Sequence, residues 1–244
     1  MTEIRPHRDE PLPAIVPALL SFVAGYVDSY TYLALFGLFA AQVTGSFVIA
    51  GAELIRHDVG VAGKLIAIVA FVAAAAITTA LIGLARNAGR APLPWMLALE
   101  AALLAIFVAI ILFDPTISGA NDWHGIVAGL LAAMAMGAQS VLVRLLMKGI
   151  PQTSVMTGNM TNLGIAVAEL IAARRRFSHS THGAAAIRQY HEVRDQLLLV
   201  LSVAVGFFAG GAVAFAVIGL PGALLAVAIV AALALWALVR GSVA

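Results

Sequence analysis

The sequence predicts an all-α protein that crosses a lipid bilayer several times, and three observations lead to this fold class. Apolar residues make up 62% of the 244 residues and charged residues only 11%, whereas soluble domains carry about 25% charged residues. Apolar runs near or above the roughly 18 residues that cross a ~30 Å hydrocarbon core recur along the chain. Because lipid cannot hydrogen-bond to the backbone, these runs are expected to be helices, and no alternating barrel strands are found.

Eight apolar segments follow a polar N-terminal tail at residues 1–13, which we expect in the cytoplasm. The first segment is too long for a signal-peptide core and lacks a small-x-small cleavage site, so it is interpreted as a retained span. Pro221 separates the last two segments. The first membrane repeat, 14–113, contains 14–39, 43–55, 63–85 and 94–113; a polar link at 114–123 leads to the second, 124–240, which contains 124–147, 155–173, 197–220 and 222–239 and a basic insert at 174–196.

Internal repetition divides the chain into two halves. Two motifs recur in the same order: Gln42-Val43-Thr44-Gly45-Ser46 returns as Val155-Met156-Thr157-Gly158-Asn159, and Ala52-Glu53-Leu54-Ile55 returns as Ala168-Glu169-Leu170-Ile171. Glutamate is scarce in this chain, so duplication explains the match better than chance. Each half is therefore predicted to hold three full spans and one short helix. Short, glycine-interrupted segments at matching places in two halves are typical of transporter binding sites.

The distribution of basic residues between the two membrane faces distinguishes two possible topologies. If both short helices cross the membrane, the Lys and Arg residues divide into 10 inside and 4 outside; if both re-enter from the face where they started, the division is 12 and 2. Positive-inside counting favours the second arrangement, in which the two halves are inverted. The first stays open because the segment 155–173 is long enough to cross.

Asp28 is the most unusual residue of the first span because a carboxylate near mid-membrane depth costs about 2.5–3.5 kcal/mol on insertion scales. It lies among hydroxyl and aromatic side chains that include Tyr26. Two interpretations remain open. The carboxyl group is a proton- or cation-coupling acid, or it is a structural group that neighbouring hydroxyls satisfy.

The two Thr-Gly turns are the predicted solute site. Helix N-termini carry free amides and partial positive charge, so two of them meeting in the membrane can bind an anionic group. If the threonines cap these helices, their hydroxyls accept the free amides. The alternative is that the turns are only packing points. The candidate binding residues are Asp28, Tyr26, Thr44, Gly45, Ser46, Gln139, Thr157, Gly158, Asn159 and Asn162.

The remaining polar residues support weaker predictions. Glu53 and Glu169 join Asp28 as coupling candidates, although interfacial ion pairing is the simpler interpretation, and Glu100 is expected near an interface. The arginines at 174–176 are predicted to bind anionic lipids. Glycine pairs such as Gly206 and Gly210 indicate close packing and leave room for a homodimer. We predict no metal site, no cofactor and no nucleic-acid partner, and no nucleotide-binding or hydrolase motif is found.

Four segments together resemble the YoaK-like family of bacterial inner-membrane proteins, over about residues 17–238. They are Gly25-Tyr26-Val27-Asp28, Val43-Thr44-Gly45-Ser46, Met136-Gly137-Ala138-Gln139-Ser140 and Met156-Thr157-Gly158-Asn159. The resemblance implies a multi-span protein of the bacterial inner membrane, and it implies no substrate because the family has no settled activity. Ser46 departs from the Thr-Gly-Asn form of the second half, which argues against an exactly two-fold site.

The function predicted from these features is secondary transport of a small polar or anionic solute, not enzymatic catalysis. A passive channel or facilitator would use the same half-helices to line a pore. A non-transporting scaffold or accessory protein would use Asp28 and the glycines only for packing.

Overall fold

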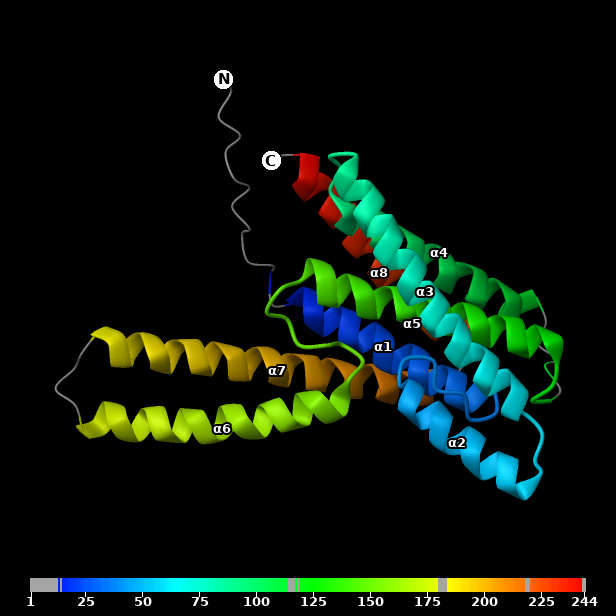
Figure 1. Ribbon diagram of the computed structural model, residues 1–244, viewed down its shortest axis with the longest axis horizontal. Helices are drawn as coiled ribbons and strands as arrows, with labels where there is room; N and C mark the ends of the chain where they lie inside the picture. The colour runs from blue at the N-terminus through cyan, green and yellow to red at the C-terminus, as the bar shows by residue number, and fades with distance from the viewer. Residues whose placement is uncertain are drawn as a thin grey trace.

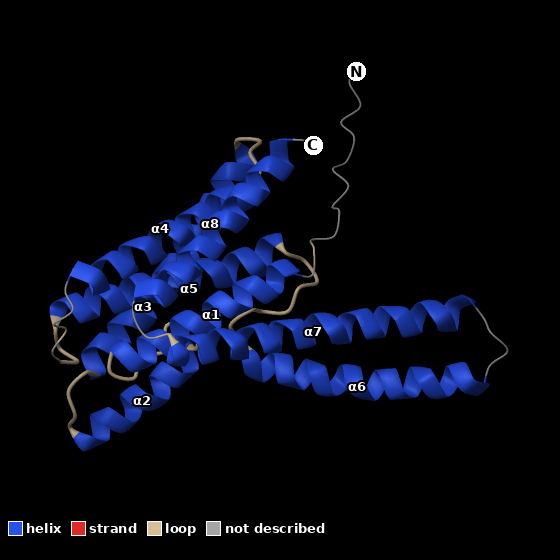
Figure 2. Ribbon diagram, turned by 180° about the vertical axis from the view of Figure 1, so that it is seen from behind, coloured by secondary structure: helices blue, strands red, loops and turns tan. Residues whose placement is uncertain are grey.

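The computed structural model describes residue 13 and residues 15–113, 117, 119–179, 184–217 and 220–242, and within these ranges the chain is all-helical (Figures 1 and 2). The tail predicted at 1–13 and much of the link predicted at 114–123 lie outside them. The described residues form α1 (Ile15–Ala34), α2 (Val43–Arg56), α3 (Val61–Asn87), α4 (Pro92–Phe113), α5 (Trp123–Leu146), α6 (Met156–His179), α7 (Ala184–Ala216) and α8 (Leu220–Ser242).

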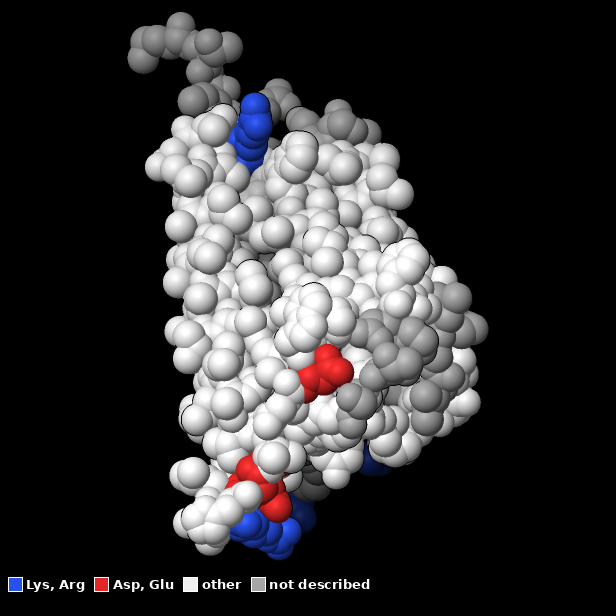
Figure 3. All heavy atoms as spheres, turned by 90° about the vertical axis from the view of Figure 1, so that its right-hand side faces the viewer, with Lys and Arg blue, Asp and Glu red and all other residues white. Residues whose placement is uncertain are grey.

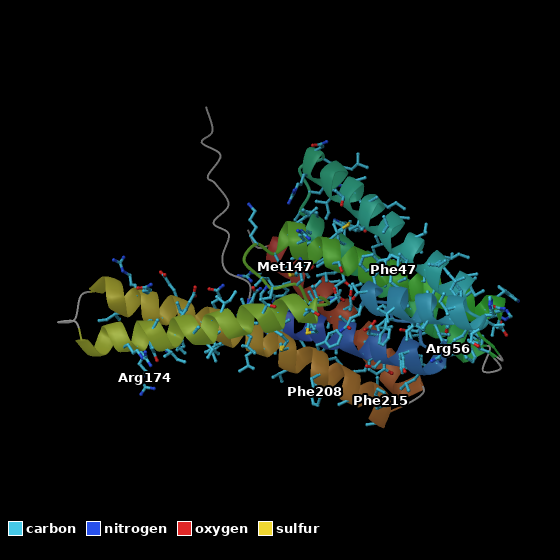
Figure 4. All side chains as sticks on the ribbon, turned by 60° about the horizontal axis from the view of Figure 1, so that its bottom comes forward. Phe47, Arg56, Met147, Arg174, Phe208 and Phe215 are labelled. Atoms are coloured by element: carbon cyan, nitrogen blue, oxygen red, sulfur yellow. The ribbon has the colours of Figure 1, made fainter. Side chains whose placement is uncertain are left out.

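Five of these helices (α3, α4, α5, α7 and α8) are long and apolar enough to cross a membrane, which confirms the predicted fold class. Figure 3 shows the right-hand side of Figure 1, and Lys, Arg, Asp and Glu cover only a small part of its visible surface. Phe208 and Phe215 project outward from α7 in Figure 4. The helix α1 is not among the five because polar residues fill its second half. Its 20 residues still span about 30 Å, and twelve of them are buried.

The central helix α1 runs parallel to α7, and glycines bring the two backbones into contact. Gly206 lies against the carbonyl of Ala18, Gly210 lies against that of Phe22, and Gly25 lies against that of Phe207. Glycine permits this approach because it has no Cβ atom. The Gly206 and Gly210 pair is thus used for packing within one chain, and the homodimer stays a prediction.

The helices α3 and α5 form a second parallel pair. Gly63 lies near Ile126 at their starts, and Gly137 lies against the carbonyl of Phe71 farther along. The helix α4 packs chiefly against α5 and α8.

The helix α5 runs antiparallel to α1. The end of α1 meets the start of α5, where Leu35 lies near Gly125. Near the other end of the pair, Gln139 of α5 donates a hydrogen bond to the carbonyl of Leu20.

The helices α2 and α6, which correspond to the two short helices predicted from the sequence, begin in the middle of the molecule (Figure 1). Only α2, with 14 residues, is short; α6 has 24 residues and is longer than predicted. After α1 the chain turns back through Phe36 and Gly37, which have positive φ angles of 53° and 79°, and then enters α2. The two helices run toward opposite ends (Figure 1), and Arg56 and Arg174 mark these ends in Figure 4.

The basic insert predicted at 174–196 is helical where the structure describes it. The helix α6 continues to His179, and α7 begins at Ala184, so the two form a hairpin that projects from the bundle (Figure 2). The 33 residues of α7 are about 50 Å long, which exceeds a ~30 Å hydrocarbon core. The insert thus continues α6 and precedes the apolar part of α7 as helix, which agrees with the high helix propensity of Ala, Arg and Gln; its cytoplasmic location stays a prediction.

Candidate functional site

The carboxylate of Asp28 holds the start of α2. Its Oδ1 atom accepts hydrogen bonds from the backbone amides of Ala41, at 2.7 Å, and Gln42, at 3.1 Å. Asp28 is only 2% exposed, so these amides take the place of water around its charge. A negative group beside a helix N-terminus is also stabilised by the helix dipole. Gln42 is the N-cap residue, so the expectation that Thr44 caps this helix is corrected.

The third residue of each Thr-Gly motif closes the loop before its helix in the same way. The Ser46 hydroxyl donates to the carbonyl of Phe39, at 2.9 Å, and accepts from its amide, at 3.0 Å. Asn159 donates through Nδ2 to the carbonyl of Gln152 at 2.6 Å. Both bonds reach back seven residues. The predicted site residues Ser46 and Asn159 therefore have a clear structural role, and a role in solute binding stays a prediction.

Gln139 of α5 contacts the loop before α6, as Asp28 of α1 contacts the loop before α2. Its Nε2 group donates to the hydroxyl of Thr153, at 2.8 Å, and to the carbonyl of Leu20, at 2.9 Å. The hydroxyl of Ser21 lies 3.0 Å from the carbonyl of Thr153 and 2.7 Å from that of Val203. This network ties the loop before α6 to α1, α5 and α7. The Oε1 atom of Gln139 is buried and has no hydrogen-bond partner among the described residues.

The two helix starts approach α1 at neighbouring levels. Ser21 touches the loop before α6 and Asp28 touches the loop before α2. These two residues are seven positions apart on α1, which is two helical turns or about 10 Å. The candidate site is therefore the region along α1 between Ser21 and Asp28.

The other predicted binding residues are less enclosed. Thr44, Thr157, Gly158 and Asn162 are exposed, and Gly45 packs against the ring of Phe39. Tyr26 is buried, stacks on Tyr30 with ring centroids 5.9 Å apart, and keeps its hydroxyl next to Gly222 without a hydrogen-bond partner among the described residues. The structure thus brings Asp28, Tyr26 and Gln139 into the core, and leaves the exposed four at its margin.

Glu53 forms a partly buried ion pair whose partner, Lys64, the sequence did not indicate. Its Oε1 atom lies 2.8 Å from the Nζ of Lys64, which is 3% exposed and also donates to the carbonyl of Phe36 at 2.9 Å. This cluster joins the end of α1, the end of α2 and the start of α3. Beside it lies a cavity of about 20 Å³, which has room for roughly one water molecule.

Glu169, Arg174 and Arg175, which the sequence singled out, lie on the surface of the hairpin of α6 and α7. Glu169 is exposed and lines a cavity of about 260 Å³ between α6 and α7, with Gln189 and Val193. Arg174 and Arg175 are exposed, and the side chain of Arg176 lies outside the described residues. Neither this cavity nor the one at Lys64 is lined by a Thr-Gly residue.

Sequence reasoning missed Lys64, Ser21, Thr153 and Glu100. Lys64 was used only to count charges, because its position near the start of a span is typical of an interfacial residue. Ser21 and Thr153 are common residue types whose importance depends on which helix lies opposite. Glu100 is fully buried, although it was expected near an interface. Its position eight residues into α4 was the signal that could have indicated burial.

Comparison with known proteins gives a family but no described activity. The chain is similar to the UPF0700 transmembrane protein YoaK of Bacillus subtilis (strain 168), with 30% identity over 149 residues, 60% of this chain and 63% of that protein. The match thus spans less than two thirds of this relative's length. No solved structure matches the chain. The family model described as "Protein of unknown function (DUF1275)" matches residues 16–238. With its apolar helices and this coverage, the chain is a multi-pass membrane protein that belongs to the DUF1275 family.

Proposed function

We propose that this protein is a secondary transporter for a small polar or anionic solute, built from two inverted halves in which the helices α2 and α6 re-enter the membrane. One observation carries the proposal. Both of these helices begin inside the bundle, against buried polar side chains of α1 and α5, and run toward opposite ends of the molecule. In secondary transporters, broken helices of this kind hold the solute near the bilayer midplane.

The helix contacts support two equivalent halves. If α1 to α4 are exchanged with α5 to α8 in order, the α1 and α7 pair becomes the α5 and α3 pair. The α2 and α3 pair becomes the α6 and α7 pair, and the α4 and α5 pair becomes the α8 and α1 pair, while the α4 and α8 pair is unchanged. All of these pairs are in contact. This correspondence favours duplication over chance similarity of the two motifs.

Two contacts favour re-entry over eight full crossings. With eight crossings α1 and α5 would run in the same direction, whereas the pairs of Leu35 with Gly125 and of Leu20 with Gln139 make them antiparallel. Eight crossings would also separate the end of α1 from the start of α3 by a whole membrane, about 30 Å. Lys64 at the start of α3 instead bonds to the carbonyl of Phe36 just after α1.

The two helix starts are not electrically equivalent, which indicates where an anionic group binds. The carboxylate of Asp28 already stands at the start of α2, so a second anion there would be repelled. At the start of α6 the neighbouring side chain is the neutral Gln139, which keeps one unpartnered amide oxygen. We therefore expect the negative end of the solute near α6 and a hydrogen-bond donor of the solute near Gln139.

Uptake by the reconstituted full chain tests this proposal. A thermal-shift screen of small metabolites on purified protein first selects solutes, and isotope-labelled forms of the best ones are then given to proteoliposomes. We expect accumulation above the external concentration when a pH gradient is imposed, and only equilibration when the gradient is dissipated. Protein-free liposomes are the control.

Two other outcomes assign the alternative functions. Uptake that never exceeds equilibration and is indifferent to the gradient would make the protein a passive facilitator. Absence of both thermal stabilisation and uptake across the metabolite panel would overturn transport and leave a scaffold or accessory role.

A further inference from the structure

The carboxyl group of Glu100 is the least satisfied polar group among the described residues. Glu100 lies on α4, is 0% exposed, and neither Oε1 nor Oε2 has a hydrogen-bond partner there. Asp28, the other acid deep in a span, differs because Oδ1 accepts two backbone amides. Native proteins contain few buried polar atoms without a partner, so each one calls for an explanation. For Asp28 the explanation is structural, and for Glu100 the hydrogen bonds of the described residues offer none.

No basic residue stands opposite Glu100 on the helices that bury it. The segments 65–85 of α3, 125–143 of α5 and 221–239 of α8 contain no Lys, Arg, His, Asp or Glu. The titratable groups of these helices stand near their ends, and they are Lys64, Arg86, His124, Arg144 and Arg240. On α4 itself Glu100 is the sole charged residue. Tyr30 of α1 contacts the ring of Phe107 on α4, two turns beyond Glu100.

This environment favours the neutral acid over the carboxylate. Glu100 lies eight residues after Pro92, about 12 Å into a helix about 33 Å long, so water at the membrane surface does not reach it. An unpaired carboxylate in such a place loses its hydration without gaining a partner, at a cost of several kcal/mol. The buried state therefore stores a proton on Glu100. The carboxyl group releases the proton only when a conformational change brings water to it.

The position of Glu100 connects this proton to movement of the two halves. The helix α4 belongs to the first half, and its main contacts, α5 and α8, belong to the second. Any rocking of one half against the other must change the interface that buries Glu100. We propose that Glu100, not Asp28, is the coupling carboxyl group of this protein: it takes up a proton from one face, is occluded as the neutral acid, and releases the proton to the other face.

This inference rests on the proposed function for its driving force, the transmembrane proton gradient. Each cycle forms one O–H bond on Glu100 from a proton of one aqueous phase and breaks it again toward the other phase. One proton thus crosses per cycle and no other reactant is consumed. Asp28 remains a positioning residue that holds the start of α2.

Labelling with dicyclohexylcarbodiimide tests the protonated state without knowledge of the solute. This apolar reagent enters the bilayer, takes the proton of a neutral carboxylic acid on one nitrogen and adds the resulting carboxylate at its central carbon. The O-acylisourea so formed rearranges by an O-to-N acyl shift to an N-acylurea, a stable one-to-one adduct that is formed without a leaving group. In proteoliposomes that hold the full chain, peptide mass spectrometry should find the adduct on Glu100 and not on Asp28. The yield should fall as the pH is raised on both sides. The Glu100→Gln variant should lose this adduct, and Asp28→Asn should keep it.

An adduct on Asp28 in place of Glu100, or a yield at Glu100 that stays constant between pH 5 and pH 10, would overturn the proposal. The first result would make Asp28 the protonated acid, and the second would make Glu100 a permanently locked structural acid. Because Gln is neutral and similar in shape, Glu100→Gln should fold with an unchanged melting temperature. A purely structural role for a charged Glu100 would instead shift it.

Uptake measurements then separate this proposal from the transport function itself. For a solute that the wild-type protein accumulates, Glu100→Gln should lose gradient-driven accumulation by at least tenfold and keep exchange of labelled for unlabelled solute. Whatever uptake Asp28→Asn retains should still depend on the gradient, because Asp28 positions α2 and does not carry the exchanged proton. If accumulation persists in Glu100→Gln, the coupling role is wrong while transport stands. If no solute is transported although Glu100 is labelled as expected, transport is wrong while the exchangeable proton stands.

Discussion

Replacement of Gly210 by alanine is expected to prevent stable packing of α1 against α7, which is the largest stability effect that we predict. A Cβ atom at this position would meet the carbonyl oxygen of Phe22 and the amide nitrogen of Tyr26. Both atoms belong to the backbone of α1, so no side-chain rotation can relieve the overlap. Overpacking usually costs about 1–3 kcal/mol where side chains can adjust, and we expect a loss at or above the upper end of that range here. Thermal unfolding of the purified variant in detergent measures it.

Gly83→Ala provides a matched control because it makes the same chemical change in another helix. Nothing lies within 4 Å of a Cβ atom built at Gly83. Alanine favours helix over glycine by about 1 kcal/mol, so this variant should unfold at the same temperature as the wild-type protein or at a higher one. Equal stability of the Gly210→Ala and Gly83→Ala variants would contradict the close α1 and α7 packing.

Replacement of Asp28 by alanine is expected to release the start of α2 and to destabilise the protein by about 3 kcal/mol or more. The variant removes two hydrogen bonds to a charged group, each worth about 1.5–3 kcal/mol, and leaves the amides of Ala41 and Gln42 unpartnered. Asp28→Asn keeps an oxygen acceptor and should lose less. Hydrogen exchange followed by mass spectrometry should show faster exchange in the loop before α2 and unchanged exchange in the loop before α6.

Thr44→Ala serves as the comparison for Asp28 because Thr44 lies in the same region but is exposed. Exposed substitutions away from special features usually change stability by less than about 0.5 kcal/mol. If Asp28→Ala were as stable as Thr44→Ala and protected the loop before α2 equally well, the positioning role of Asp28 would be wrong.

The class of fold could be predicted from the sequence because a surface that faces lipid requires a high share of apolar residues. The apolar segments correspond to helices, and the Thr-Gly motifs mark the starts of α2 and α6, since Thr44 and Thr157 stand in their first turns. Burial of Asp28 could also be predicted, because a carboxylate within an apolar span must avoid lipid. These features follow from local sequence and the physics of the bilayer.

The partners of the buried polar groups could not be predicted, because they come from distant parts of the chain. The hydroxyl of Ser21 meets the carbonyls of Thr153 and Val203, which are 132 and 182 residues away in sequence. Hydropathy also treats lipid and protein interior alike, so it could not separate Glu100, which is buried by neighbouring helices, from a residue near the interface. The burial of Lys64 could not be predicted for the same reason.

The starts of α2 and α6 are closed in similar ways but differ in charge, and this asymmetry bears on the proposed mechanism. Ser46 and Asn159 make equivalent loop closures, whereas Asp28 and Gln139 place a charged and a neutral group at the two helix starts. A symmetric pair of anion sites is therefore not expected. The loop before α2 is held by the acid Asp28, whereas the loop before α6 is held by the neutral side chain of Gln139.

Thiol labelling of three single-cysteine variants tests the inverted, re-entrant arrangement most directly, and the chain is well suited because it contains no cysteine. The variants Asp58→Cys, Arg90→Cys and Gln189→Cys carry exposed positions after α2, after α3 and on the hairpin. With a membrane-impermeant maleimide on sealed vesicles of known orientation, the thiols of Arg90→Cys and Gln189→Cys should share one face, and that of Asp58→Cys should lie on the other. If Asp58→Cys and Gln189→Cys instead share a face opposite Arg90→Cys, both short helices cross the membrane and the account is contradicted.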